Sequence, residues 1–97
     1  MKNIAVTPGA IKNLIKTITH TVSNLTINTT MTYIDAIADT EVPSGYQLMC
    51  VKVDGVDGTS GIVYSLSNHN GGYHTVRGYA ISQITKNVTV TYYLLKG

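Results

Sequence analysis

Three histidines and a single cysteine are the residues of this sequence with the widest chemical range. His69 and His74 stand on either side of Asn70-Gly71-Gly72, a strong signal for a hairpin turn. Two imidazoles that flank a hairpin are suited to bind a metal ion, but no third ligand stands at a spacing typical of zinc sites. The sequence therefore predicts neither a metal site nor a cofactor.

Cys50 is the candidate nucleophile, and catalysis by its thiolate would need a histidine base held beside it. The residue lies between Met49 and Val51 in an apolar run, a setting typical of a buried structural cysteine. No pair of side chains elsewhere has the context of a catalytic centre. We therefore expect no enzymatic activity and assign no catalytic residue.

A group of polar and aromatic residues around the same hairpin is suited to binding. Tyrosine rings with neighbouring hydrogen-bonding groups suit sugar faces and polar protein surfaces, and they equally suit a sandwich core whose hydroxyls reach water. The residues predicted to form a surface-binding or glycan-binding site are His69, Asn70, Tyr73, His74, Arg77 and Tyr79.

All five acidic residues fall within residues 35–57, together with one lysine, which gives this segment a local charge of −4. The segment also contains the turn signals Pro43-Ser44-Gly45 and Asp54-Gly55. We interpret it as a solvated loop region rather than as a site.

Length and composition exclude several classes of protein. A chain of 97 residues allows one domain, and its 43% hydrophobic residues argue against disorder. The net charge of +2 is too small for an electrostatic nucleic-acid binder. No apolar run reaches the roughly 18 residues of a membrane helix, and no secretory signal is present. We expect a soluble cytoplasmic product without a nucleic-acid partner or membrane insertion.

Residues 8–25 are predicted to form a helix, with Thr7 as its cap and Pro8 in its first turn. Apolar residues recur there at spacings of 4, 3, 4 and 3, the a/d pattern of a coiled coil. Two interpretations stay open: a helix packed on its own sheet, or a short parallel bundle, for which isoleucine at both positions favours three chains. The trimer interface would consist of Ile11, Ile15, Ile18, Val22 and Leu25.

Beyond Leu25 the hydrophobic period changes to two, which predicts β-strands. Such a series predicts a mainly β fold. The two candidate architectures are an antiparallel β-sandwich, or small jelly-roll-like head, and a small barrel. The last run is apolar on both faces, so we expect it to be a central or covered strand. The alternating runs cover residues 25–33, 46–53, 61–67, 72–82 and 86–96.

The segment from Pro43 to Gly97 resembles the C-terminal head domain of tailed-phage fibre and baseplate proteins. The resemblance rests on three features in a fixed order: the strand entry Val42-Pro43-Ser44-Gly45-Tyr46, short strands around Val63-Tyr64-Ser65-Leu66, and an alternating final strand at residues 87–96. Most such heads contain a tryptophan and longer relatives carry an extended shaft, whereas this sequence has no tryptophan and only two heptads.

This resemblance implies a homotrimeric bacteriophage virion fibre whose β head contacts a glycan or protein of the host surface. It implies an attachment segment at residues 1–10 that binds other virion proteins, a coiled coil at residues 11–25 and a β-sandwich head at residues 26–97. The protein would be located in the virion, after assembly in the host cytoplasm. Two alternatives are a capsid head-fibre or decoration protein without a receptor site, and a monomeric carbohydrate-binding module.

Overall fold

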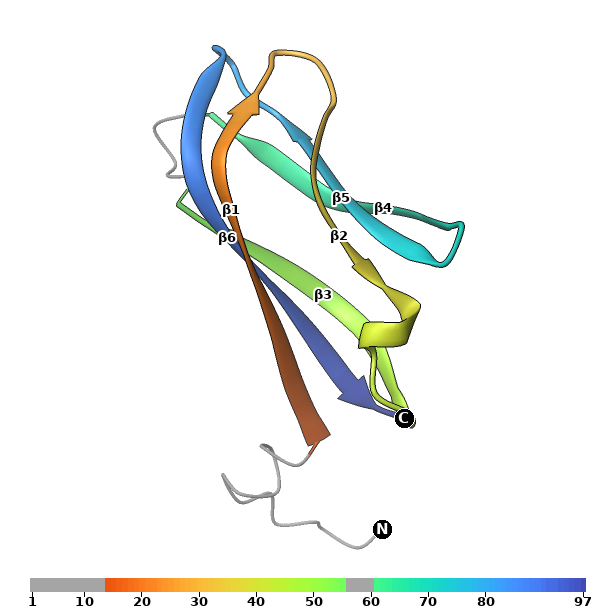
Figure 1. Ribbon diagram of the computed structural model, residues 1–97. Helices are drawn as coiled ribbons and strands as arrows, with labels where there is room; N and C mark the ends of the chain where they lie inside the picture. Colours follow the sequence, from red (N-terminus) through yellow and green to blue (C-terminus); the bar gives the residue numbers. More distant parts are fainter. Residues whose placement is uncertain (1–13, 56–60) are drawn as a thin grey trace, which may run out of the picture.

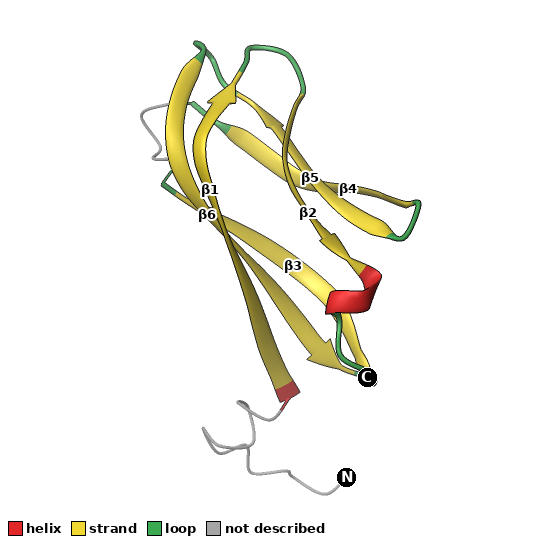
Figure 2. Cartoon of the chain, viewed as in Figure 1, coloured by secondary structure: helices red, strands yellow, loops and turns green. Residues whose placement is uncertain are grey.

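The computed structural model describes residues 14–55 and 61–97, most of which belong to β-strands (Figure 1, Figure 2). A single turn of 3-10 helix, η1 (Asp39–Glu41), follows the second strand directly. The predicted mainly β fold is therefore confirmed. The strands are β1 (Ile15–Ile27), β2 (Thr32–Ala38), β3 (Tyr46–Asp54), β4 (Val63–Asn70), β5 (Tyr73–Tyr79) and β6 (Ile84–Lys96).

The described strands form two antiparallel sheets of three strands each. The first sheet has the order β1-β6-β3 and the second has the order β2-β5-β4. The chain passes from one sheet to the other at every step from β1 to β4, returns as the β4–β5 hairpin and ends in β6 (Figure 1). This architecture is consistent with the predicted β-sandwich, and the expected central position of the last strand is confirmed.

The core lies between the sheets and is built from alternate residues of the strands, because successive side chains of a strand point to opposite faces. Fully burying an aliphatic side chain of this kind stabilises the fold by about 1.5–3 kcal/mol. The buried cluster that joins the two sheets consists of Ile34, Ile37 and Val76 from the second sheet and Val53, Val88, Val90 and Tyr92 from the first.

The predicted helix and coiled coil are wrong for residues 15–25, which belong to β1 and pair antiparallel with β6. Ile18, Val22 and Leu25 were expected at a trimer seam, but they pack against the core of their own sandwich. Isoleucine, valine and threonine dominate this segment, and such β-branched side chains favour a strand over a helix.

A β-bulge explains how a strand can carry the spacing of a heptad. Ile18, His20 and Val22 are half-buried and alternate with exposed threonines, so the step of four from Ile18 to Val22 is two ordinary strand repeats. The register then shifts between Val22 and Leu25, where Asn24 adopts a left-handed φ of 54°. Because the bulge adds one residue to β1, Val22 and Leu25 both face the core although they are three residues apart.

The sandwich begins at Ile15 rather than at the predicted boundary of residue 26. Ile15 is half-buried in β1, opposite Leu95 of β6. Ile11, the predicted attachment segment at residues 1–10 and the start of the predicted helix lie outside the described residues.

The other predicted strands correspond to β3, β4, β5 and β6 within a few residues, whereas a turn at residues 28–31 divides the predicted run 25–33 between β1 and β2. The prediction that Cys50 is buried is wrong, because its side chain is exposed. The register of β3 with β6 shifts between Leu48 and Cys50, which places both Met49 and Cys50 among the exposed residues.

Replacement of Asn24 tests the bulge. Asn24→Ala should lower the free energy of unfolding by about 1–2 kcal/mol, the cost of a left-handed conformation for a residue other than asparagine or glycine. Asn24→Gly should cost less, because its backbone adopts this conformation readily. Both variants keep the backbone N–H that donates to Oδ1 of Asn87 at 2.8 Å. Urea unfolding measures the difference, with Ser23→Ala as the control; equal losses in the two Asn24 variants would contradict the bulge.

Candidate functional site

All three histidines of the sequence contact carboxylates from residues 35–41, which comprise the end of β2 and η1. His20 binds two of these carboxylates, and His69 and His74 share a third. The interpretation of the acidic segment as a solvated loop is wrong for Asp35, which lies in β2 with its side chain only 16% exposed. Asp39 and Glu41 are exposed, as expected, but each contacts a histidine.

His20, Asp35, Glu41 and Tyr92 form a group of contacts that we call the inter-sheet network. Oδ2 of Asp35 accepts hydrogen bonds from Nδ1 of His20 and from the hydroxyl of Tyr92, each at 2.6 Å. Nε2 of His20 lies 2.8 Å from Oε2 of Glu41. A carboxylate only accepts hydrogen bonds, so two such partners require an N–H on both ring nitrogens, which is the imidazolium form. The network ties β1 and β6 of the first sheet to β2 and η1.

A β-bulge in β2 turns Asp35 towards the core. The register with β5 shifts between Tyr33 and Asp35, and the intervening Ile34 is fully buried. Strict alternation from Ile34 would place Asp35 on the outer face of the sheet. Instead Asp35 lies opposite the buried Val76, and its side chain is only 16% exposed.

The network shifts the pKa values of its members in directions that fit this geometry. Burial lowers the pKa of His20, but hydrogen bonds to Glu41 and Asp35 outweigh burial and raise it above the ordinary value of 6.5. The backbone N–H of Ala38, followed by the His20 ring, lowers the pKa of Glu41 below 4.5. Burial, followed by the hydrogen bond to Asp35, raises the pKa of Tyr92 well above 10, so its hydroxyl stays a donor.

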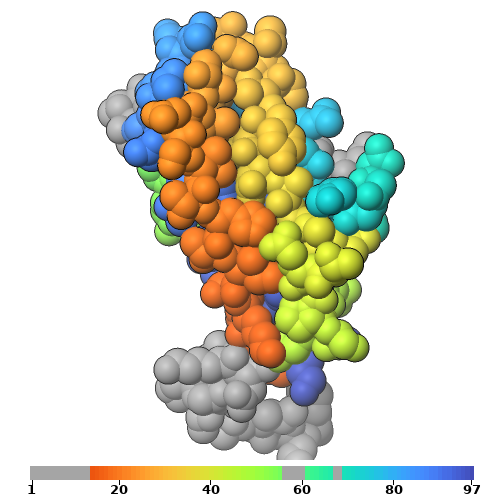
Figure 3. All heavy atoms as spheres, in the orientation of Figure 1, coloured from red at the N-terminus to blue at the C-terminus, as the bar shows by residue number. Residues whose placement is uncertain are grey.

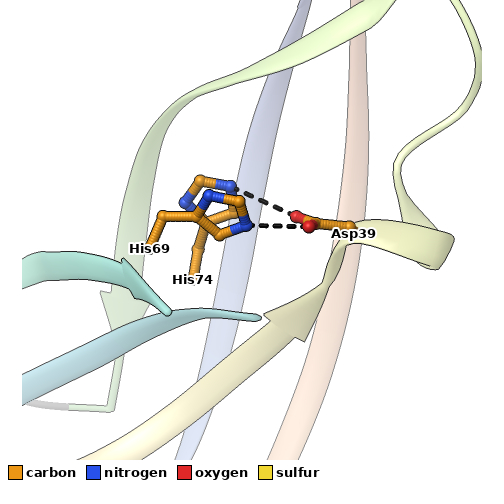
Figure 4. Close-up of side chains that lie close together, drawn as sticks. All are labelled: Asp39, His69 and His74. Atoms are coloured by element: carbon orange, nitrogen blue, oxygen red, sulfur yellow. Dashed lines mark hydrogen bonds and ion pairs between the residues drawn. The ribbon is translucent and has the colours of Figure 1, made fainter. Parts of the chain in front are cut away.

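A second group, which we call the hairpin cluster, consists of Asp39, His69 and His74. Nε2 of His69 lies 2.7 Å from Oδ2 of Asp39, and Nε2 of His74 lies 3.5 Å from Oδ1. The two rings stack with their centroids 4.1 Å apart and their planes at 9°, and both present a nitrogen to the carboxylate (Figure 4). The side chains are accessible, from 28% exposed for His74 to 50% for His69.

Backbone contacts hold the hairpin cluster in place. His69 and His74 are directly opposite each other in the β4–β5 pairing, which is why their rings stack. The N–H of Asp39 donates to the carbonyl of Gly72 in the turn of the same hairpin, at 2.9 Å. Figure 3 shows this hairpin beside the segment that contains η1, at the surface of the molecule.

An open depression adjoins the hairpin cluster. Asp39 and His74 contribute to its lining, together with residues 42–48, which lead from η1 into β3. One side of the cluster is therefore accessible to solvent and to small ligands.

The six residues predicted to bind a surface or a glycan divide into two places. Tyr73, Arg77 and Tyr79 alternate with the buried Val76 and Gly78, so they lie on the outer face of the second sheet. His69 and His74 face Asp39, and Asn70 is exposed at the hairpin end, opposite Tyr73.

The sequence did not reveal two further residues, one on the outer face of the second sheet and one in the hairpin cluster. Tyr33 is 58% exposed and pairs with Arg77, so it extends the outer face on which Tyr73 and Tyr79 lie. Asp39 completes the hairpin cluster from a position thirty residues before His69. No local spacing signals either partner, because the pairing of β2 with β5 brings them there.

No family model matches the sequence, and neither the curated proteins nor the solved structures include a significant match to it. The resemblance to phage fibre heads therefore rests on the sequence features alone. In the described part of the chain, no helix has the length and apolar character needed to span a membrane.

Removal of one hydroxyl tests the inter-sheet network. Tyr92→Phe should lower the free energy of unfolding by about 1–3 kcal/mol, because the inward-facing carboxylate of Asp35 loses a donor while the aromatic ring is retained. The matched control is Tyr93→Phe, next in sequence on the half-buried outer face, which should change stability by less than about 0.5 kcal/mol. Similar effects of the two substitutions in denaturant unfolding would contradict this role.

The same network predicts a pH dependence of stability. The raised pKa of His20 stabilises the fold fully below its unfolded value of 6.5, and this contribution is lost as pH rises through the folded pKa. The lowered pKa of Glu41 stabilises the fold above 4.5, and this contribution is lost as pH falls through the folded pKa. The network should therefore contribute most between pH 4.5 and pH 6.5.

The substitution His20→Gln isolates the histidine contribution, because an amide does not titrate. Thermal unfolding of the natural protein should show that Tm falls as pH rises above 6.5, and in the His20→Gln variant Tm should fall much less over the same range. The control is Thr19→Ala, on the exposed side of β1, in which Tm should fall as much as in the natural protein. An unchanged fall in the His20 variant would rule out this histidine as its source.

Proposed function

We propose that this chain is the non-enzymatic β head of a bacteriophage virion fibre or appendage, and that it contacts the host surface. The observation that carries the proposal is the outer face of the second sheet, where Tyr33, Tyr73 and Tyr79 are 58%, 52% and 42% exposed beside Arg77. Exposed tyrosines offer flat apolar surfaces for stacking and hydroxyls for hydrogen bonds, and Arg77 adds a charged donor.

The size of this tyrosine face suits an extended ligand. Tyr73 and Tyr79 lie six residues apart on one strand, which corresponds to about 20 Å at 3.4 Å per residue. Tyr33 lies beside Arg77, between the two ends of this row. Such a surface can contact several units of a surface polysaccharide, or an extended protein segment.

The strand connectivity supports a head of jelly-roll type. β1 pairs with β6 and β2 pairs with β5, which is the pairing expected of a chain that is folded back on itself and then wound into two sheets. Jelly rolls occur in viral capsid and lectin domains, which covers both the structural role and the glycan binding proposed here.

The coiled coil no longer supports three chains, because residues 15–25 are part of the sandwich. The homotrimer, the N-terminal attachment to other virion proteins and the location in the virion thus remain proposals that rest on the resemblance. Static light scattering tests the oligomeric state directly. A monomer would favour the alternative of a carbohydrate-binding module, which uses the same tyrosine face without a particle.

Binding to a glycan array tests the tyrosine face. The double variant Tyr33→Ala, Tyr73→Ala should lose binding at least tenfold, about 1.4 kcal/mol, because exposed aromatic side chains at the centre of a contact carry much of its free energy. Tyr93→Ala, on the outer face of the first sheet, is the matched control and should bind like the natural protein.

Two results would overturn the assignment to the tyrosine face. Equal binding by the double variant would place the contact elsewhere on the molecule. Absence of binding to glycans and to intact host cells, by a chain that unfolds cooperatively, would favour the decoration protein without a receptor site.

A further inference from the structure

We propose that Asp39, His69 and His74 bind one divalent transition-metal ion, with zinc as the reference case. The hairpin cluster brings together two imidazoles and one carboxylate, a donor set that zinc and related metals use. Each residue offers one ligand atom, and these atoms all lie within 4.8 Å of one another. This site is independent of the tyrosine face, which lies on the outside of the second sheet.

The distances in the cluster are close to those of a metal site. Zn–N bonds of about 2.0–2.1 Å in tetrahedral geometry place neighbouring ligand atoms about 3.3 Å apart. Nε2 of His69 lies 2.7 Å from Oδ2 of Asp39 and Nε2 of His74 lies 3.5 Å from Oδ1, both within about 0.6 Å of that separation. Occupation therefore requires rotations of the side chains that open the shorter contact and splay the stacked rings.

The ligand atoms stand on backbone that is already fixed. His69 and His74 are opposite each other in a paired hairpin, and Asp39 is joined to the turn of that hairpin through Gly72. Asp39 opens η1, and the carboxylate of the last residue of η1, Glu41, accepts from the N–H of Ala38. Ligands held on paired strands and a bonded turn lose little freedom on binding, which favours affinity.

The charge balance of the cluster also favours a cation. In the described part of the chain, the ion pairs of Asp39 are with the two histidines, and no lysine or arginine neutralises it. A divalent ion that displaces the Nε2 protons would receive three donors, namely the two Nε2 lone pairs and one carboxylate oxygen, once the stacked rings have splayed. Three metal–ligand bonds would then replace the hydrogen bond of His69 and the longer contact of His74 with Asp39.

The type of ligand determines the type of metal. Calcium and magnesium prefer six or more oxygen ligands, whereas this cluster offers two nitrogens and one carboxylate. Imidazole suits zinc, copper, nickel and iron. With three protein ligands, at least one coordination position remains for water, and Asp39 and His74 also line the open depression through which it is reached.

Isothermal titration of the full chain with zinc chloride tests the proposal. We expect one equivalent to bind saturably, with no comparable binding of calcium or magnesium. His69→Gln and His74→Gln should each weaken binding at least tenfold, and Asp39→Asn should do the same. The matched control is His20→Gln, which also removes a histidine held by carboxylates, but from the inter-sheet network; it should retain the affinity of the natural protein.

Histidine ring resonances provide a second readout that does not depend on the fold of any variant. Zinc should shift the ring signals of His69 and His74 in the natural protein and leave those of His20 in place. Three results would overturn the proposal: no saturable binding to the natural protein, undiminished binding to the His69→Gln, His74→Gln double variant, or shifts confined to His20.

Discussion

The sandwich depends on one carboxylate that lies between its sheets. Asp35 belongs to the second sheet, whereas its donors His20 and Tyr92 belong to the first, and both contacts measure 2.6 Å. A carboxylate in this position is costly unless it is hydrogen-bonded, so both donors stabilise the fold. Apolar packing between the sheets is non-directional. The hydrogen bonds of Asp35 are directional, so they fix which residues of the two sheets face each other.

The turn η1 connects this constraint to the molecular surface. It follows β2 without a linker, so the bulge that directs Asp35 inwards also determines where Asp39 and Glu41 leave the sheet. Glu41 reaches back to the first sheet, and Asp39 reaches forward to the β4–β5 hairpin. One three-residue turn therefore supplies carboxylates to both histidine groups.

The strands were predictable because alternation is a local property, and it marked β3, β4, β5 and β6 within a few residues. The histidine sites were not predictable, since Asp39 reaches His69 across thirty residues only after β2 pairs with β5. The error at residues 15–25 has a different cause. A strand with a bulge at Asn24 and a helix with a heptad stripe both place Ile18, Val22 and Leu25 on one face, so spacing alone does not distinguish them.

Bulges also explain why the two histidine groups could not be predicted from the sequence. Strict alternation would send Asp35 to the outer face beside Tyr33, and His69 to the same face as the exposed Ser65. Register shifts between Tyr33 and Asp35 and between Leu66 and His69 reverse both directions. Asp35 then meets His20 and Tyr92 between the sheets, and His69 stacks on His74. A one-residue irregularity shifts the alternation beyond it by one position, so it redirects a polar side chain while the strand still contributes to the apolar core on both sides of the bulge.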